Sequence, residues 1–99
     1  MSPVSQIEVD DFLLRHPGWR LENKALRSEF TFTDFKQAKA FIDVIAEEAE
    51  SMDHHPEWRN RKNKVDVALI TPNLKTVSTL DLAMAKSMEY NYELIRDLS

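Results

Sequence analysis

The sequence predicts a single-layer α+β fold, in which three helices cover one face of a four-stranded antiparallel sheet. Two observations support this class. Apolar residues recur at helical spacing in three segments, and shorter segments alternate between apolar and polar residues, as half-buried strands do. The segments follow the order helix, strand, strand, helix, strand, strand, helix. No repeat or linker interrupts the 99 residues, so we expect residues 1–99 to form one domain.

The first helix and the first two strands are expected within the first third of the chain. Residues 5–15 combine apolar side chains with acids near the start, which is typical of a short amphipathic helix. Pro17 and Gly18 end that helix. Residues 19–21 indicate a short strand, and residues 25–32 alternate as a half-buried strand should.

A long helix is predicted next, with Thr33 as its N-cap and an end near Asp53. Its apolar residues lie three or four positions apart, as on one buried face: Phe35, Ala38, Phe41, Ile42, Ile45, Ala49 and Met52. Residues 57–61 and 64–71 then indicate a β-hairpin, because the second of these segments alternates between apolar and polar side chains.

The final helix is expected to follow a loop at residues 72–77. The four residues from Ser78 to Asp81 have the form of a capping box, with a shorter acid in place of Glu. We expect this helix to bury the following side chains: Leu80, Ala83, Met84, Met88 and Ile95.

Composition excludes several classes of function. The chain has 13 Lys and Arg against 17 Asp and Glu, a net charge of −4, which argues against direct binding of nucleic acid or an anionic membrane. The absence of cysteine excludes disulfides, thiol catalysis and cysteine-ligated zinc. No apolar run approaches the roughly 20 residues that span a bilayer, and the first residues lack signal-peptide features, so we expect a cytoplasmic protein. Exposed sheet edges or helix faces favour a homo-oligomer.

One dense polar cluster, residues 50–58, lies where the long helix is expected to end. His54 and His55 can act as general acid and base near neutral pH. Glu50 can orient His54 if the helix continues that far, and Trp58 offers a flat wall for an aromatic ligand. A purely structural role explains the cluster about equally well, because helix C-termini favour His and turns favour Pro. Consecutive histidines rarely bind one ion and no third ligand follows, so no metal site is expected.

At this cluster the sequence resembles the pterin-4a-carbinolamine dehydratase family. The family pattern is an acid, three residues and His-His-Pro, then an aromatic residue, a further His after the next strand, and an Asp near the start of the last helix. The matching residues are Glu50, Asp53, His54, His55, Pro56, Trp58, Thr71, Ser78 and Asp81. The resemblance covers nearly the whole chain, because the expected order of elements is also that of the family.

The resemblance implies an activity. Members of the family dehydrate 4a-hydroxytetrahydropterin to quinonoid dihydropterin, which recycles the tetrahydrobiopterin cofactor of aromatic amino acid hydroxylases, and they need no metal or cofactor of their own. By this resemblance His54 and His55 are the catalytic acid–base pair. Substrate-binding or supporting roles are implied for Glu50, Asp53, Pro56, Trp58 and Asp81. A homodimer or homotetramer is also implied.

The sequence departs from the family pattern at three positions, which we expect on one side of the site. Pro72 stands where the family has its further histidine, Lys62 where it has an aromatic residue, and Thr76 where it has glycine. A single general acid or base contributes about 10²–10⁴-fold to a rate. Two interpretations therefore stay open: a working dehydratase with two histidines, and an inactive dehydratase-like module that binds or assembles other proteins. A third is an unrelated α+β domain with a coincidental His-His-Pro sequence.

Overall fold

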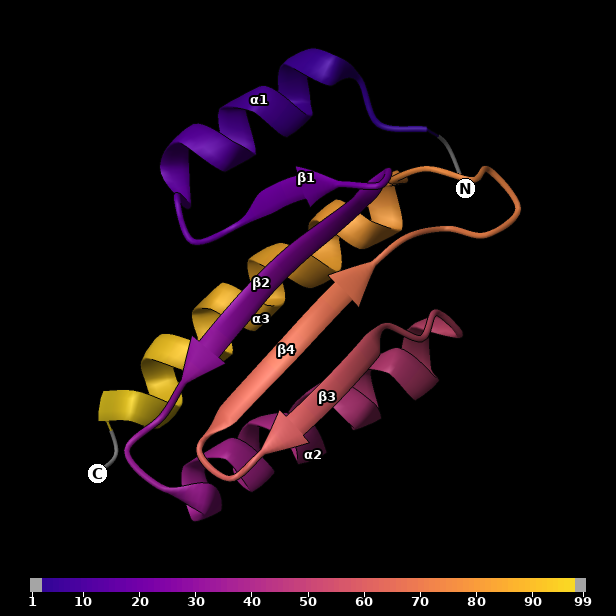
Figure 1. Cartoon of the computed structure of the whole chain (residues 1–99). Coiled ribbons are helices and arrows are strands. Elements are labelled where there is room, and N and C mark those ends of the chain that lie inside the picture. The colour runs from indigo at the N-terminus through magenta and orange to yellow at the C-terminus, as the bar shows by residue number, and fades with distance from the viewer. Residues whose placement is uncertain (1–2, 98–99) are drawn as a thin grey trace.

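The computed structural model describes residues 3–97 and contains the predicted elements in the predicted order (Figure 1). These elements are α1 (Gln6–Arg15), β1 (Arg20–Glu22), β2 (Ala25–Thr31), α2 (Phe35–Met52), β3 (Glu57–Arg61), β4 (Lys64–Leu69) and α3 (Thr79–Asp97). The strand order in the sheet is β1-β2-β4-β3, and every neighbouring pair is antiparallel. The predicted α+β class is confirmed.

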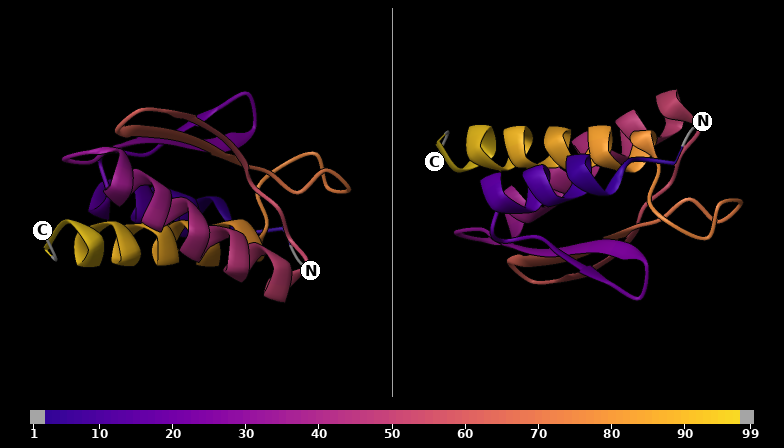
Figure 2. Two further views of the ribbon diagram at one scale, coloured as in Figure 1. Left: turned by 90° about the horizontal axis from the view of Figure 1, so that it is seen from below. Right: turned by 90° about the horizontal axis from the view of Figure 1, so that it is seen from above.

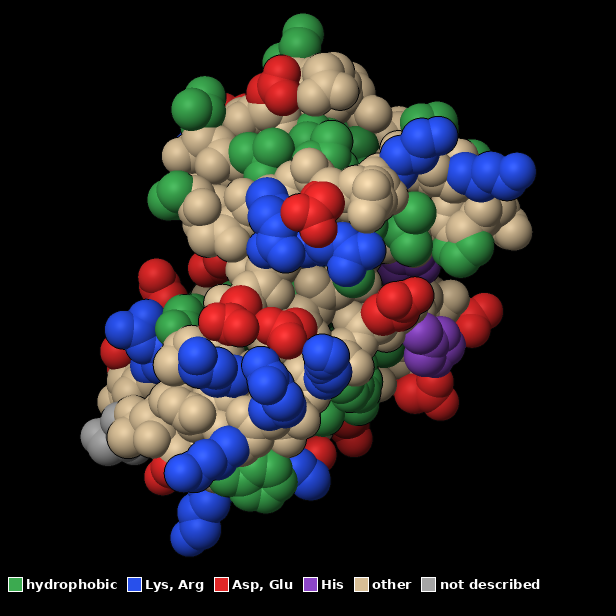
Figure 3. Space-filling view, in the orientation of Figure 1, with side chains coloured by type: hydrophobic (Ala, Val, Ile, Leu, Met, Phe, Trp, Pro, Cys, Tyr) green, Lys and Arg blue, Asp and Glu red, His purple; other side chains and the backbone are tan. Residues whose placement is uncertain are grey.

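The two faces of the sheet differ. All three helices lie on the same side of the sheet (Figure 2), where the alternating side chains of β2 and β4 form the core with them. Leu26 and Phe30 of β2, and Val65 and Leu69 of β4, are buried there. The opposite face is open, and charged side chains of both signs cover it (Figure 3).

Trp19 connects the first strand to the last helix. Its side chain is buried among Phe12 and Phe30, and its indole N–H donates a hydrogen bond of 2.6 Å to Oε1 of Glu89 on α3. The buried indole therefore has the polar partner that it needs away from water. This bond ties the segment between α1 and β1 to the helix layer.

The hairpin of β3 and β4 determines which loops meet. Arg61 pairs with Lys64 beside the turn, whereas Glu57 pairs with Ala68 at the other end of the ladder. Residues that precede β3 and residues that follow β4 therefore lie at the same end of the sheet. The histidines and the segment leading to α3 are brought together in this way.

The start of α2 differs from the prediction. Asp34, not Thr33, is the N-cap: its backbone is extended and its Oδ1 accepts the backbone N–H of Gln37 at 2.9 Å. A charged carboxylate is a better N-cap than the neutral hydroxyl of Thr33, because its negative charge is also favourable at the positive N-terminus of the helix. The helix consequently begins at Phe35, whose side chain is 51% exposed at the helix end instead of buried as predicted.

The buried face of α3 is rotated from the predicted one. Ala83 is exposed and Leu80 is only half-buried, while Leu82 and Ala85 are buried instead. Met84, Met88 and Ile95 are buried as predicted. The cause is Asp81, a polar residue that points inward to partners of its own, so apolar spacing alone misplaced the helix face.

Candidate active site

The C-terminus of α2 leads directly into the two neighbouring histidines, both of which follow its C-cap. Asp53 is the C-cap and has left-handed backbone angles (φ 50°, ψ 44°), a conformation that Asp tolerates better than most residues. Its N–H donates to the carbonyl groups of Ala49 and Glu50, and the N–H of His54 donates to Ala49 at 3.1 Å. This turn ends the helix and starts the extended segment that leads to β3.

His54 is buried against the first turn of α3. Its side chain is 7% exposed, and its Nε2 lies 2.5 Å from Oδ1 of Asp81, a carboxylate with no exposed surface. Asp81 lies 27 positions further along the chain, so the fold alone brings the two together. The carboxylate fixes the orientation of the imidazole and favours a hydrogen on Nε2.

His55 makes a second imidazole–carboxylate pair in a different environment. Its Nε2 lies 2.6 Å from Oε2 of Glu50, with 57% of the His55 side chain and 79% of the Glu50 side chain exposed. We predicted that Glu50 could orient His54, but that required the helix to continue. Because α2 ends at Met52, Glu50 reaches His55 instead.

The other predicted site residues lie beside these pairs and play different parts. Asp53 contributes its backbone conformation to the turn, and its side chain is exposed. Pro56 is half-buried at the entrance to β3. Trp58 pairs with Val67, so it points to the helix-covered side of the sheet at its β3 edge, where it is 38% exposed.

Two of the departures from the family pattern lie at opposite ends of the β3–β4 hairpin. Lys62 is in the turn, with a left-handed backbone (φ 57°), whereas Pro72 follows β4 at the end where the histidines lie. The expectation that the departures share one side of the site is therefore wrong for Lys62. Pro72 is exposed, and its carbonyl accepts the N–H of Lys75 at 3.1 Å within the loop.

Thr71 and Ser78 match the family pattern but were given no role by the resemblance, and the structure places both of them beside Asp81. Both are buried, and both lie within hydrogen-bond distance of Oδ2 of Asp81: 2.7 Å from the Thr71 hydroxyl and 2.8 Å from the Ser78 backbone nitrogen. Two signals were available, namely the match of both residues to the family pattern and the capping-box spacing from Ser78 to Asp81, which we took only as the start of a helix.

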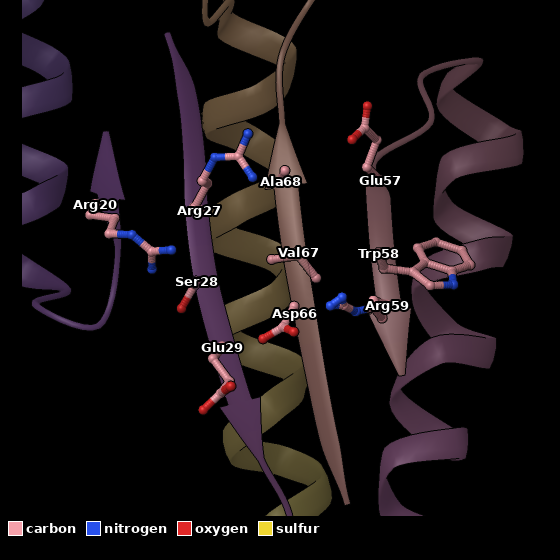
Figure 4. A pocket seen from close by; sticks show the side chains of 10 residues that line it. All are labelled: Arg20, Arg27, Ser28, Glu29, Glu57, Trp58, Arg59, Asp66, Val67 and Ala68. Carbon is pink, nitrogen blue, oxygen red and sulfur yellow. The ribbon is translucent and has the colours of Figure 1, made fainter. Parts of the chain in front are cut away.

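A cavity of about 610 Å³ lies on the open face of the sheet (Figure 4). Its charged lining residues are Arg20, Arg27, Glu29, Glu57, Arg59 and Asp66. A second cavity of about 300 Å³ lies between α1 and α3. Neither cavity is lined by His54 or His55, so both are distinct from the predicted catalytic pair.

Among residues 3–97, no group of three or more His, Cys, Asp or Glu side chains is arranged so that it could hold a metal ion. Within the same range, no helix combines the length and apolar character needed to cross a membrane.

Comparison with known proteins gives consistent results. The family model described as "Pterin 4 alpha carbinolamine dehydratase" matches residues 2–90. Curated relatives from several organisms carry the name "Putative pterin-4-alpha-carbinolamine dehydratase". The one from Rhizorhabdus wittichii is 40% identical over 91 residues, covering 90% of this chain and 94% of the relative. The one from Prochlorococcus marinus (strain NATL2A) is 33% identical over 89 residues, covering 90% and 94%.

Solved structures with this fold include two of direct interest. The crystal structure of a transcriptional coactivator/pterin dehydratase from Brucella melitensis has a TM-score of 0.84 at 36% identity, covering 91% of this chain and 98% of that one. A pterin dehydratase-like protein identified as a RuBisCO assembly factor in the α-carboxysome has a TM-score of 0.67 at 25% identity, covering 78% and 92%.

Proposed function

Because the chain belongs to the pterin-4a-carbinolamine dehydratase family, we propose that it dehydrates 4a-hydroxytetrahydropterin to quinonoid dihydropterin by histidine acid–base catalysis. His54 and His55 are the proposed acid–base pair. The observation that carries this proposal is the pair of imidazole–carboxylate contacts, His54 with Asp81 and His55 with Glu50, at the junction of α2 and β3. In each contact a carboxylate occupies one ring nitrogen and leaves the other for a substrate.

The chemistry requires one proton to be given and one to be taken. A protonated imidazole donates its proton to the 4a-hydroxyl as the C–O bond breaks, and the oxygen leaves as water. A neutral imidazole takes the proton of a ring N–H, whose electron pair forms the new C=N bond. The two imidazoles then exchange their charge through solvent, so the protein returns to its starting state.

The proposal is tested by a dehydration assay on chemically generated 4a-hydroxytetrahydropterin. We expect the wild-type protein to accelerate the reaction, and His54→Ala or His55→Ala to lower kcat about 10²–10⁴-fold, the usual contribution of a general acid or base. His16→Ala is the matched control. His16 is the C-cap of α1 and packs against Phe12, so we expect no loss of rate. A folded wild-type protein without acceleration would contradict the proposal.

A second candidate function is a binding or assembly module without catalysis. Two observations favour it: Pro72 occupies the position of the family's further histidine, and a relative in structure is a RuBisCO assembly factor. Size-exclusion chromatography, with light scattering, of the chain mixed with purified RuBisCO tests this function. Co-elution by a chain that shows no dehydratase activity would support it, and an active chain that elutes alone would contradict it.

We also propose a cytoplasmic homodimer or homotetramer. β3 is an edge strand of the sheet, and large apolar side chains are exposed on the helices, namely Ile7, Leu14, Tyr90 and Leu94. Unpaired edges and exposed apolar groups favour association between chains. Light scattering of the isolated protein measures the number of chains directly, and a monomer at micromolar concentration would contradict this proposal.

A further inference from the structure

A buried polar cluster supports His54 from behind. Thr71, Ser78 and Asp81 are all at most 1% exposed. The hydroxyl oxygens of Thr71 and Ser78 are 2.6 Å apart, and the Thr71 hydroxyl is 2.7 Å from Oδ2 of Asp81. The Ser78 backbone N–H also donates to Oδ2 at 2.8 Å, and the Leu80 N–H donates to the Ser78 hydroxyl at 3.2 Å.

Counting hydrogens gives the direction of these bonds. The Thr71 hydroxyl has one hydrogen, so it can donate to Asp81 or to Ser78 but not to both. The Ser78 hydroxyl lies 3.4 Å from Oδ2, which makes it the poorer donor to the carboxylate. The arrangement that satisfies every group runs from Leu80 N–H to the Ser78 hydroxyl, from there to the Thr71 hydroxyl, and on to Oδ2 of Asp81.

We propose that Thr71 is a positioning residue, which holds the Asp81 carboxylate so that His54 keeps its hydrogen on Nε2 and presents Nδ1 for proton transfer. This inference rests on the proposed function. The Thr71 hydroxyl and the Ser78 backbone N–H both donate to Oδ2 of Asp81, so Oδ1 is the oxygen directed at His54. The carboxylate is then a pure acceptor, and an acceptor facing Nε2 selects the tautomer in which that nitrogen carries the hydrogen.

The backbone around Thr71 keeps the hydroxyl in place. Thr71 follows β4, and its N–H donates to the Thr76 carbonyl at 3.0 Å, closing the loop. The far end of this loop is held by the N-terminal segment, since the N–H of Val4 donates to Val77 at 3.4 Å and Pro3 forms a bridge with Ser78. These two backbone links hold Thr71 and Ser78, the residues that donate hydrogen bonds to Asp81, in place relative to each other.

The test replaces the hydroxyl and preserves the shape of the side chain. Thr71→Val removes the donor, and Thr71→Ser keeps it. Ser28→Ala is the matched control, because Ser28 of β2 is also buried but donates its hydroxyl to the carbonyl of Gly18, in the turn before β1. We expect Thr71→Val to lower kcat about ten-fold, less than the loss of the acid or base itself, with little change in KM. Thr71→Ser and Ser28→Ala should keep kcat.

Nitrogen-15 NMR of the imidazole rings gives a readout independent of activity. At a pH where His54 is neutral, we expect the wild type to show the hydrogen on Nε2, and Thr71→Val to show a mixture of both tautomers. Should Thr71→Val fail to fold, the comparison of Thr71→Ala with Thr71→Ser isolates the hydroxyl in the same way.

The outcomes separate the two proposals. If the wild type is inactive but the tautomer depends on the Thr71 hydroxyl, the proposed function fails and the positioning role stands. If the wild type is active but removal of the hydroxyl changes neither kcat nor the tautomer, the positioning role is overturned.

Discussion

Two adjacent histidines, His54 and His55, each contact a carboxylate, and the surroundings of these two imidazole–carboxylate pairs are opposite. His54 and Asp81 are buried, whereas His55 and Glu50 are mostly exposed. The buried pair joins two segments far apart in the chain, and the exposed pair joins one end of α2 to the residues directly after it. A single left-handed residue, Asp53, lies between the helix and both histidines.

The difference in burial gives the two imidazoles different properties: one is held in a fixed orientation, and the other can exchange protons with water. A buried imidazole held by a fixed carboxylate has one orientation and one preferred tautomer, because every neighbour is specified. An exposed imidazole can exchange its proton with water and can change its side-chain orientation at little cost. Under the proposed function, the two pairs would therefore supply two distinct requirements of an acid–base reaction.

The largest effect is expected from replacing the buried carboxylate, Asp81, by an amide. In Asp81→Asn the amide oxygen must still accept the Ser78 N–H, so the amide NH₂ faces His54 and forces its hydrogen onto Nδ1. We expect the free energy of unfolding to fall by about 1.5–3 kcal/mol, the range for hydrogen bonds to a charged group. Urea denaturation measures the loss, and nitrogen-15 NMR measures the tautomer.

A variant that keeps both wild-type stability and the wild-type tautomer would show that Asp81 does not control His54. The Asp53→Asn variant provides a control for a carboxylate close to the site, because Asp53 contributes its backbone and Asn tolerates the same left-handed conformation. We expect its stability to stay within about 0.5 kcal/mol of the wild type.

A smaller effect is expected from restoring the family's third imidazole. Pro72 is exposed, and its loop uses only its carbonyl, so Pro72→His should fold normally. Under the proposed function we expect kcat to rise about ten-fold, equivalent to about 1.4 kcal/mol of activation free energy. Steady-state dehydration kinetics measure this. An unchanged kcat would show that His54 and His55 already supply all the proton transfer that the reaction uses.

The smallest effect is expected at the exposed pair. Glu50→Gln makes the same carboxylate-to-amide change as Asp81→Asn, but both partners are open to solvent. We expect the free energy of unfolding to change by less than about 1 kcal/mol, as is usual for exposed ion pairs. Urea denaturation of the two variants under the same conditions gives the comparison directly. A larger loss in Glu50→Gln than in Asp81→Asn would contradict the division between a buried pair of fixed orientation and an exposed pair that exchanges protons with water.

Much of the fold could be predicted because apolar spacing reports burial. The order of all elements is correct, and the two segments predicted to alternate, residues 25–32 and 64–71, contain the central strands β2 and β4. The two errors both arise at the first turn of a helix, but their causes differ. Phe35 is exposed because a helix terminus projects beyond the core, and the face of α3 was misplaced because its inward-facing Asp81 is polar. Hydrophobic periodicity cannot register a buried carboxylate.

The site was predictable in its residue types but not in its pairing. The His-His-Pro sequence and the resemblance to the family indicated both histidines. The partners depended on where α2 ends. Because the helix ends at Met52 and does not continue to His54, Glu50 pairs with His55. The contact between Thr71 and Asp81 depends on the β4–α3 loop returning to the start of α3. The family pattern included both residues, but nothing near them in the sequence indicated that they would touch.

The two tryptophans give the protein a pair of optical probes with separate meanings. Trp19 is buried with its indole hydrogen-bonded to Glu89, while Trp58 lies partly exposed at the β3 edge, four residues from His54. A water-soluble quencher such as iodide therefore reaches Trp58 and leaves Trp19 bright. Fluorescence that survives the quencher reports whether the helix layer is intact, and the quenched fraction reports what happens at the edge strand beside the histidines. Fluorescence spectra with and without the quencher can thus follow both unfolding and ligand binding, with no label attached to the protein.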